Sequence, residues 1–157
     1  MRRKDREIKD RELVSQIIRN CQVCRLGLAK DDAPYIVPVS FGYDGNAVYF
    51  HTAREGKKID YIMANNAVCF EFEHGVQLVP DERYPCKWTF SFQSVIGNGR
   101  IHELVTLGEK IEGLNQILKQ YSGQEWALGG MQLDTIRVWK ITIQTITGKQ
   151  SGNKNAT

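Results

Sequence analysis

Residues 49–60 read Tyr49-Phe50-His51-Thr52-Ala53-Arg54-Glu55-Gly56-Lys57-Lys58-Ile59-Asp60. A strand is predicted to end near Thr52, Gly56 allows a tight turn, and a helix is predicted to begin at Lys57. The exposed N–H groups at a helix start attract anions, as does its dipole. The ammonium groups of Lys57 and Lys58 and the Thr52 hydroxyl would add further donors. The residues alone leave two interpretations open: a phosphate-binding turn, or an exposed turn whose lysines contact only water.

The residues before this stretch predict a pair of antiparallel strands and a hairpin. A strand is predicted over 35–41, where Tyr35, Val37, Val39 and Phe41 alternate with Ile36, Pro38 and Ser40. Pro38 places this strand at an edge, at a bulge or where something docks, because proline cannot donate to a ladder. Asp44-Gly45-Asn46 is a strong hairpin signal. A planar ring could lie along this valine-rich strand, but ordinary core packing is the favoured interpretation of its valines on the residues alone.

The rest of the chain adds further strands and two more helices. A phase slip at Ser94-Val95-Ile96, followed by Gly97-Asn98-Gly99, predicts a bulge or sharp bend. Residues 74–86 are expected to form an irregular loop. Helices are predicted over 10–20, 57–64 and from the capping box Thr106-x-x-Glu109 to Gly123. Strands are predicted over 24–28, 35–41, 47–52, 68–73 and 88–96, and a last pair of strands within 136–146. The predicted fold is α+β and mainly β: one antiparallel, barrel-like sheet of six or seven strands with short helices at its ends.

Composition narrows the class of protein. The chain has 157 residues, 41% of them hydrophobic and 25% charged, which fits one globular domain. We expect the polar segment 150–157 to be a flexible tail. A formal net charge of +3, evenly spread, gives no reason to expect a nucleic-acid partner. No apolar run approaches the ~20 residues that span a membrane, and the mixed charges of residues 1–7 do not form a secretory signal, so a cytoplasmic protein is expected.

The four cysteines are Cys21, Cys24, Cys69 and Cys86. The first two have the C-x-x-C spacing of zinc and redox sites, but no second pair and no matching histidine pair follows. We therefore predict no metal site and interpret Cys21 and Cys24 as small hydrophobic residues in or near the core.

Several segments are similar to one known family. They are Met1 to Ile8, Cys24 to Leu28, Pro34 to Tyr43, Tyr49 to Ala53, Glu55 to Lys58, Ser94 to Gly99, Val138 to Lys140 and Thr147 to Lys149. These segments occur in order over nearly the whole chain. The sequence resembles the pyridoxamine 5′-phosphate oxidase-like proteins and, among them, the 5-nitroimidazole-resistance branch.

The resemblance implies an FMN-binding split β-barrel over residues 1–149 and a homodimer with flavin at the subunit interface. By this resemblance the phosphate lies on Thr52, Lys57 and Lys58, the ring lies by Val37, Val39 and Ser40, and the partner chain contributes Ser94, Trp139 and Lys149. His51 matches the family's histidine near the flavin and is the candidate catalytic residue, holding substrate or relaying protons with its near-neutral pKa. Glu55 in the turn, and Lys149 as the only basic residue in the matching tail, depart from the oxidase pattern and argue against vitamin B6 oxidation.

The leading hypothesis is an FMN-dependent oxidoreductase. It would transfer electrons from NAD(P)H or another donor to a small acceptor such as a nitroaromatic ring. A non-catalytic flavin-binding or storage protein is the first alternative. A haem-binding barrel with His51, His74 or His102 as axial ligand is the second.

Overall fold

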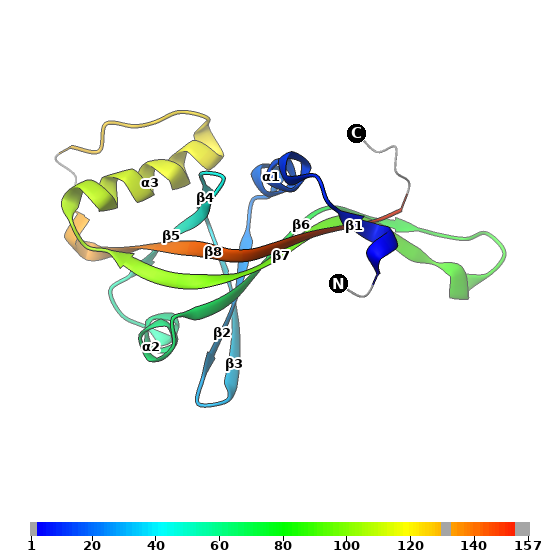
Figure 1. The fold of residues 1–157 in the computed structure, drawn as a ribbon, viewed down its shortest axis with the longest axis horizontal. Helices are drawn as coiled ribbons and strands as arrows, with labels where there is room; N and C mark the ends of the chain where they lie inside the picture. The colour runs from blue at the N-terminus through cyan, green and yellow to red at the C-terminus, as the bar shows by residue number, and fades with distance from the viewer. Residues whose placement is uncertain (1–2, 130–132, 153–157) are drawn as a thin grey trace.

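The computed structural model describes residues 3–129 and 133–152 and is built around an antiparallel sheet of eight strands (Figure 1). The sheet order is β3-β2-β6-β7-β8-β5-β4, and β1 pairs with β8. The strands are β1 (Glu7–Ile8), β2 (Cys24–Lys30), β3 (Ala33–Val39), β4 (Gly42–Tyr43), β5 (Ala47–Ala53), β6 (Ala67–Val79), β7 (Thr89–Leu104) and β8 (Ile136–Ser151). The helices are α1 (Arg11–Asn20), α2 (Lys57–Ala64) and α3 (Leu107–Ser122), with short 3₁₀ turns at Lys4–Arg6, Pro85–Lys87 and Leu133–Thr135.

This architecture confirms the predicted α+β class and its antiparallel pairing. The sheet has one strand more than the upper number predicted, because two-residue strands such as β1 and β4 leave no alternation to detect. Pro38 lies on β3, the strand at one end of the sheet order. The predicted bulge is confirmed by a register shift between Asn98 and Gly99.

Local hydrogen bonds place the helix ends where the sequence predicts them. Asp10 accepts the N–H groups of Glu12 and Leu13 at the start of α1. Thr106 and Glu109 form the reciprocal capping box of α3. Gly123 ends α3 in the left-handed conformation, with φ of 73°, which favours glycine.

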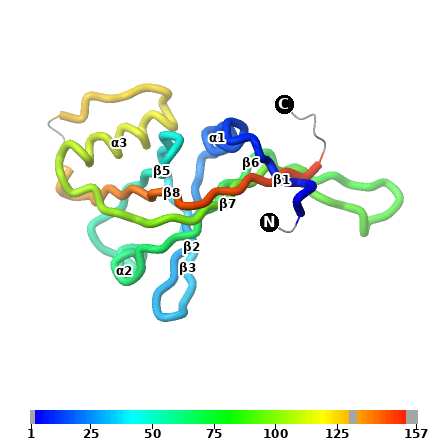
Figure 2. The backbone as a smooth tube through the Cα atoms, in the orientation of Figure 1, coloured from blue at the N-terminus to red at the C-terminus, as the bar shows by residue number. Residues whose placement is uncertain are grey.

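Two long strands extend beyond the barrel and correct the predicted loop at 74–86. β6 continues through Val79, and it pairs with β7 as far as Val79 opposite Thr89, so the two strands form an arm (Figures 1 and 2). A register shift between His74 and Gln77 hides this pairing from a period-two pattern. β8 is one continuous strand where a pair was expected within 136–146, because no turn interrupts its pairing with β7. It runs through Ser151, two residues into the segment expected to be a tail, while residues 153–157 lie outside the described residues.

The main core fills the barrel, and a second cluster lies outside it, beneath α3. Val48 and Phe50 of β5 point into the barrel, whereas Ala47 and Tyr49 point outward and pack against Ile117 of α3. β5 is therefore covered on both faces along most of its length. No helix in the described ranges is both long enough and apolar enough to cross a membrane.

Candidate functional site

The turn between β5 and α2 presents backbone donors. Gly56 has φ of 127°, a conformation that favours glycine, and its carbonyl accepts the N–H groups of Ile59 (2.8 Å) and Asp60 (3.2 Å). The N–H groups of Lys57 and Lys58 precede these and have no partner within the helix. Since no side chain caps α2, the helix start offers donors and the positive end of its dipole to an anion.

The two lysines of this turn differ in their surroundings. Lys57 is exposed, and its Nζ lies 4.7 Å from the ring centroid of Tyr35 on β3 and 5.7 Å from that of Tyr61 on α2. These cation–π contacts hold the ammonium group of Lys57 between β3 and α2. Lys58 is half-buried, and burial lowers its pKa.

His51 lies on the outer face of β5, opposite Val138 of β8. Its side chain remains accessible to solvent, yet partial burial, and then the positive charge of Lys58, lower its pKa below the ordinary value. The imidazole is therefore mostly neutral at pH 7 and can accept a proton or a hydrogen bond.

Thr52 points to the other face of the same strand, into the barrel, because successive side chains alternate. It is buried, accepts a hydrogen bond from Trp139 Nε1 (3.0 Å) and donates to the Ala53 carbonyl (2.7 Å). The resemblance implies that Thr52 touches a phosphate and that Trp139 reaches a flavin of the partner chain. In the structure Trp139 is only 2% exposed and belongs to the core of its own chain. Both side chains therefore act from inside the barrel.

The three residues in and next to β3 that were expected beside a ring do not share one surface. Val39 is buried in the barrel core, and Val37 is half-buried and packs against that core. Ser40, just beyond the strand, is exposed. Of these three residues, Ser40 is therefore the most accessible to a ligand.

Ser94 and Lys149 are brought together, but far from the turn. They are direct cross-strand partners on β7 and β8, and Lys149 Nζ lies 5.1 Å from the Phe92 ring centroid. Thr52 pairs with Arg137, near the opposite end of β8 from Lys149. The twelve residues from Arg137 to Lys149 correspond to roughly 40 Å of strand. Figure 1 shows β8 running from beside α3 to the arm. One chain therefore places the candidate residues in two groups at opposite ends of β8, here called the candidate half-sites.

Sequence reasoning did not find the ion pair between Arg137 and Glu103. The guanidinium donates through Nε to Glu103 (2.8 Å) and through a second, short contact, and its Cζ lies 4.6 Å from the Trp139 ring centroid. The pair borders a cavity of about 590 Å³, which is also lined by Arg54, Lys110, Asp134 and Ile136. Only the register of β7 against β8 brings Glu103 and Arg137 together.

Other candidate residues are placed away from the turn or in the core. Cys21 and Cys24 are buried, which confirms their interpretation as core residues, and burial raises the pKa of the Cys21 thiol to about 11. Within residues 3–129 and 133–152, no three His, Cys, Asp or Glu side chains are grouped as a metal site would require. His74 and His102 lie on β6 and β7.

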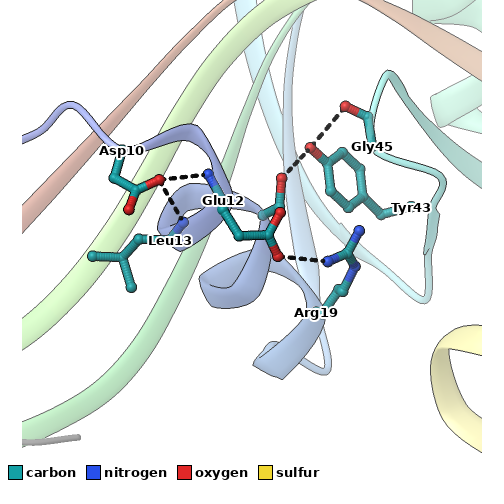
Figure 3. A network of polar contacts seen from close by, with 7 residues as sticks. Asp10, Glu12, Leu13, Arg19, Tyr43 and Gly45 are labelled. Carbon is teal, nitrogen blue, oxygen red and sulfur yellow. Dashed lines mark hydrogen bonds and ion pairs between the residues drawn. The ribbon is translucent and has the colours of Figure 1, made fainter.

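A cavity of about 710 Å³ lies apart from this turn, between α1, β1, the β4–β5 turn and β8. Its wall includes Ser15 and Tyr43, whose hydroxyls lie 3.3 Å apart, and the Tyr43 hydroxyl donates to the Gly45 carbonyl (3.0 Å; Figure 3). This network ties α1 to the β4–β5 turn. Neither Lys57 nor Lys58 lines this cavity.

Comparison with known proteins identifies relatives over nearly the whole chain. The model of the family described as pyridoxamine 5′-phosphate oxidase matches residues 10–150. An uncharacterised protein of Rhizobium meliloti (strain 1021) is 27% identical over 129 residues, which cover 80% of this chain and 76% of that protein.

Solved structures share the fold. A proposed 5-nitroimidazole antibiotic resistance protein from Bacteroides thetaiotaomicron is 28% identical, with a TM-score of 0.81 over 92% of this chain and 86% of that one. An FAD-binding protein from Mesorhizobium loti, 24% identical, aligns with a TM-score of 0.68 over 94% and 98% of the two chains. A flavocytochrome from Azotobacter vinelandii, 18% identical, aligns with a TM-score of 0.80 over 98% and 72%.

Proposed function

The chain belongs to the pyridoxamine 5′-phosphate oxidase family, and we propose that it is a flavoprotein that binds FMN between two copies of itself and reduces small acceptors. The uncapped start of α2, with Lys57 and Lys58, carries this proposal. The Bacteroides and Mesorhizobium structures support it, because they share this fold and are described as a nitroimidazole resistance protein and an FAD-binding protein.

The turn fits a phosphate group. The amides of Lys57 and Lys58, the positive end of the α2 dipole and two ammonium groups supply donors without an intervening carboxylate cap. Glu55 is the one acidic residue in the turn, and its side chain is exposed. A terminal phosphate, rather than a neutral ring, matches this donor set.

A second copy is needed to complete the site. Ser94 and Lys149 lie too far along β8 for one FMN to contact them and the turn of the same chain. Ser94 shares the outer face of β7 with Phe90 and Ile96, which are 51% and 48% exposed. An apolar stripe around the two polar groups favours coverage by a partner chain, and a homodimer with flavin at its interface explains both observations.

When bound, FMN supplies the electron transfer, and the protein supplies binding, orientation and proton handling. His51, neutral and on the outer face near Lys58, is the residue we assign to hold a small aromatic acceptor or to move a proton to it. NAD(P)H is the electron donor we propose. A nitroaromatic ring is the proposed acceptor class, on the strength of the Bacteroides relative.

An absorption spectrum before and after anaerobic addition of NADH and NADPH tests the proposal. Flavin bands that bleach support a reductase. Bands that persist favour a storage protein, a Soret band favours haem, and a protein that takes up no added FMN refutes the site.

A charge-matched pair of variants locates the site. Lys57→Ala/Lys58→Ala should lose most of its bound FMN. Arg19→Ala/Lys119→Ala removes two exposed positive charges away from both the turn and Lys149 and should keep it. Light scattering of the flavin-loaded protein should report a dimer, and a monomer with flavin still bound contradicts the interface.

A further inference from the structure

Two side chains inside the barrel and one backbone carbonyl form a continuous chain of hydrogen bonds that ends at the turn. The indole Nε1–H of Trp139 donates to Thr52 Oγ1 at 3.0 Å, and Thr52 Oγ1 donates to the carbonyl of Ala53 at 2.7 Å. Trp139 and Thr52 are 2% and 7% exposed, so the bond between them is shielded from water, whereas the bond to Ala53 is partly buried. Ala53 is the last residue of β5, three positions before Gly56.

The donor at the start of this chain is itself held in place. The Trp139 ring is stacked on Phe50, with an interplanar angle of 15° and 6.3 Å between centroids. Arg137, paired with Glu103, covers the ring from another direction. The indole is therefore fixed by the barrel before any ligand binds.

The single hydroxyl hydrogen of Thr52 is used on Ala53. The side chain therefore has no hydrogen left to donate to a phosphate, and its effect on the turn passes through the backbone. Orienting the Ala53 carbonyl fixes the peptide plane from which residues 54–56 and the free amides of Lys57 and Lys58 follow.

We infer that Trp139 is a positioning residue: acting through Thr52 from inside the barrel, it orients the β5–α2 turn that holds the flavin phosphate. This rests on the proposed FMN site and adds the residue that sets its geometry. If Trp139 touched the flavin directly, it would affect recognition of the isoalloxazine ring. The inference requires instead that the indole affect recognition of the phosphate alone.

Comparison of FMN with riboflavin, which lacks the phosphate, isolates this effect. Dissociation constants for both are measured by flavin fluorescence on the dimeric protein. Trp139→Phe keeps a ring against Phe50 and removes the Nε1 donor. It should raise the FMN Kd about fivefold, within the range expected for one buried hydrogen bond, and leave the riboflavin Kd unchanged.

Three further variants make the test specific. Thr52→Val should reproduce the loss of FMN preference, and adding Trp139→Phe to it should cause little further change. Thr52→Ser, which keeps the hydroxyl, should keep the wild-type preference for FMN over riboflavin. Ile141→Val trims the same barrel core without touching the hydrogen bonds or the ring that stacks on Trp139, so it should lower Tm and leave the ratio of the two dissociation constants as in the wild type.

Unchanged FMN preference in both Trp139→Phe and Thr52→Val overturns the inference alone. A wild-type protein that binds neither flavin overturns the proposed function, and the inference with it.

Discussion

α3 lies very close to Gly42 on β4, and replacing this glycine tests how α3 is held. A Cβ built at Gly42 would lie 2.3 Å from the Gln116 carbonyl carbon and 2.5 Å from the Ile117 nitrogen. Carbon atoms in contact prefer about 3.5–4.0 Å, so the backbone of α3 must move by roughly 1.2 Å or more. We expect Gly42→Ala to destabilise the protein by about 3 kcal/mol, at the upper end of typical overpacking. In thermal unfolding this corresponds to a Tm lowered by roughly 6–12 °C for a domain of this size.

Gly108, in the first turn of the same helix, supplies the matched control. A Cβ there meets nothing within 4 Å, so Gly108→Ala adds a better helix former without a clash. It should stabilise the protein by about 0.5 kcal/mol. Urea unfolding followed by tryptophan fluorescence measures both variants. A Gly42→Ala protein within about 0.5 kcal/mol of the wild type, a range typical of neutral surface changes, would show that α3 does not lie against β4 as described.

Three further predictions follow from single contacts. Thr106→Ala removes the N-cap of α3 and should cost about 1 kcal/mol in urea unfolding. The Arg137 hydrogen bonds lower the pKa of Glu103, so the ion pair stabilises the fold above the unfolded-state pKa, and this stabilisation is lost as pH falls through the folded-state pKa. Unfolding measured between pH 7 and 3 should show that Glu103→Gln is less stable than the wild type at pH 7, by up to about 1 kcal/mol for a pair this accessible. The stability of this variant should also fall less steeply with pH on the acid side. Lys58→Met removes the positive charge that helps to lower the pKa of His51, so an NMR titration should show the pKa of His51 rising toward its ordinary value. An unchanged pKa would show that Lys58 does not act on His51.

Elements whose ends depend on local hydrogen bonds could be predicted from the sequence. The start of α3 is an example, because Thr106 and Glu109 satisfy each other within one turn and need no distant partner. The span 57–64 of α2 is another, because Gly56 alone supplies the conformation that begins it. The position of the candidate phosphate turn follows from these same local signals.

Features that depend on register across strands could not be predicted. The register shift after His74 breaks the period-two pattern, so the arm reads as a loop even though Leu78 and Phe90 are cross-strand partners. Glu103 and Arg137 are 34 residues apart, and neither carries a signal of its pairing. The split into two candidate half-sites along β8 likewise needs the pairing of β5 and β7 with that strand.

His51 and Thr52 show how one dipeptide can serve two sides of a sheet. Strand alternation directs Thr52 inward, where Trp139 and the Ala53 carbonyl use its hydroxyl, and directs His51 outward, where solvent and Lys58 set its protonation. A motif in the sequence places both residues at the site but does not tell which one a ligand meets. Under the proposed function, a change at Thr52 should therefore alter how tightly the turn holds the phosphate of FMN. A change at His51, whose side chain is exposed, should instead alter reduction of the acceptor.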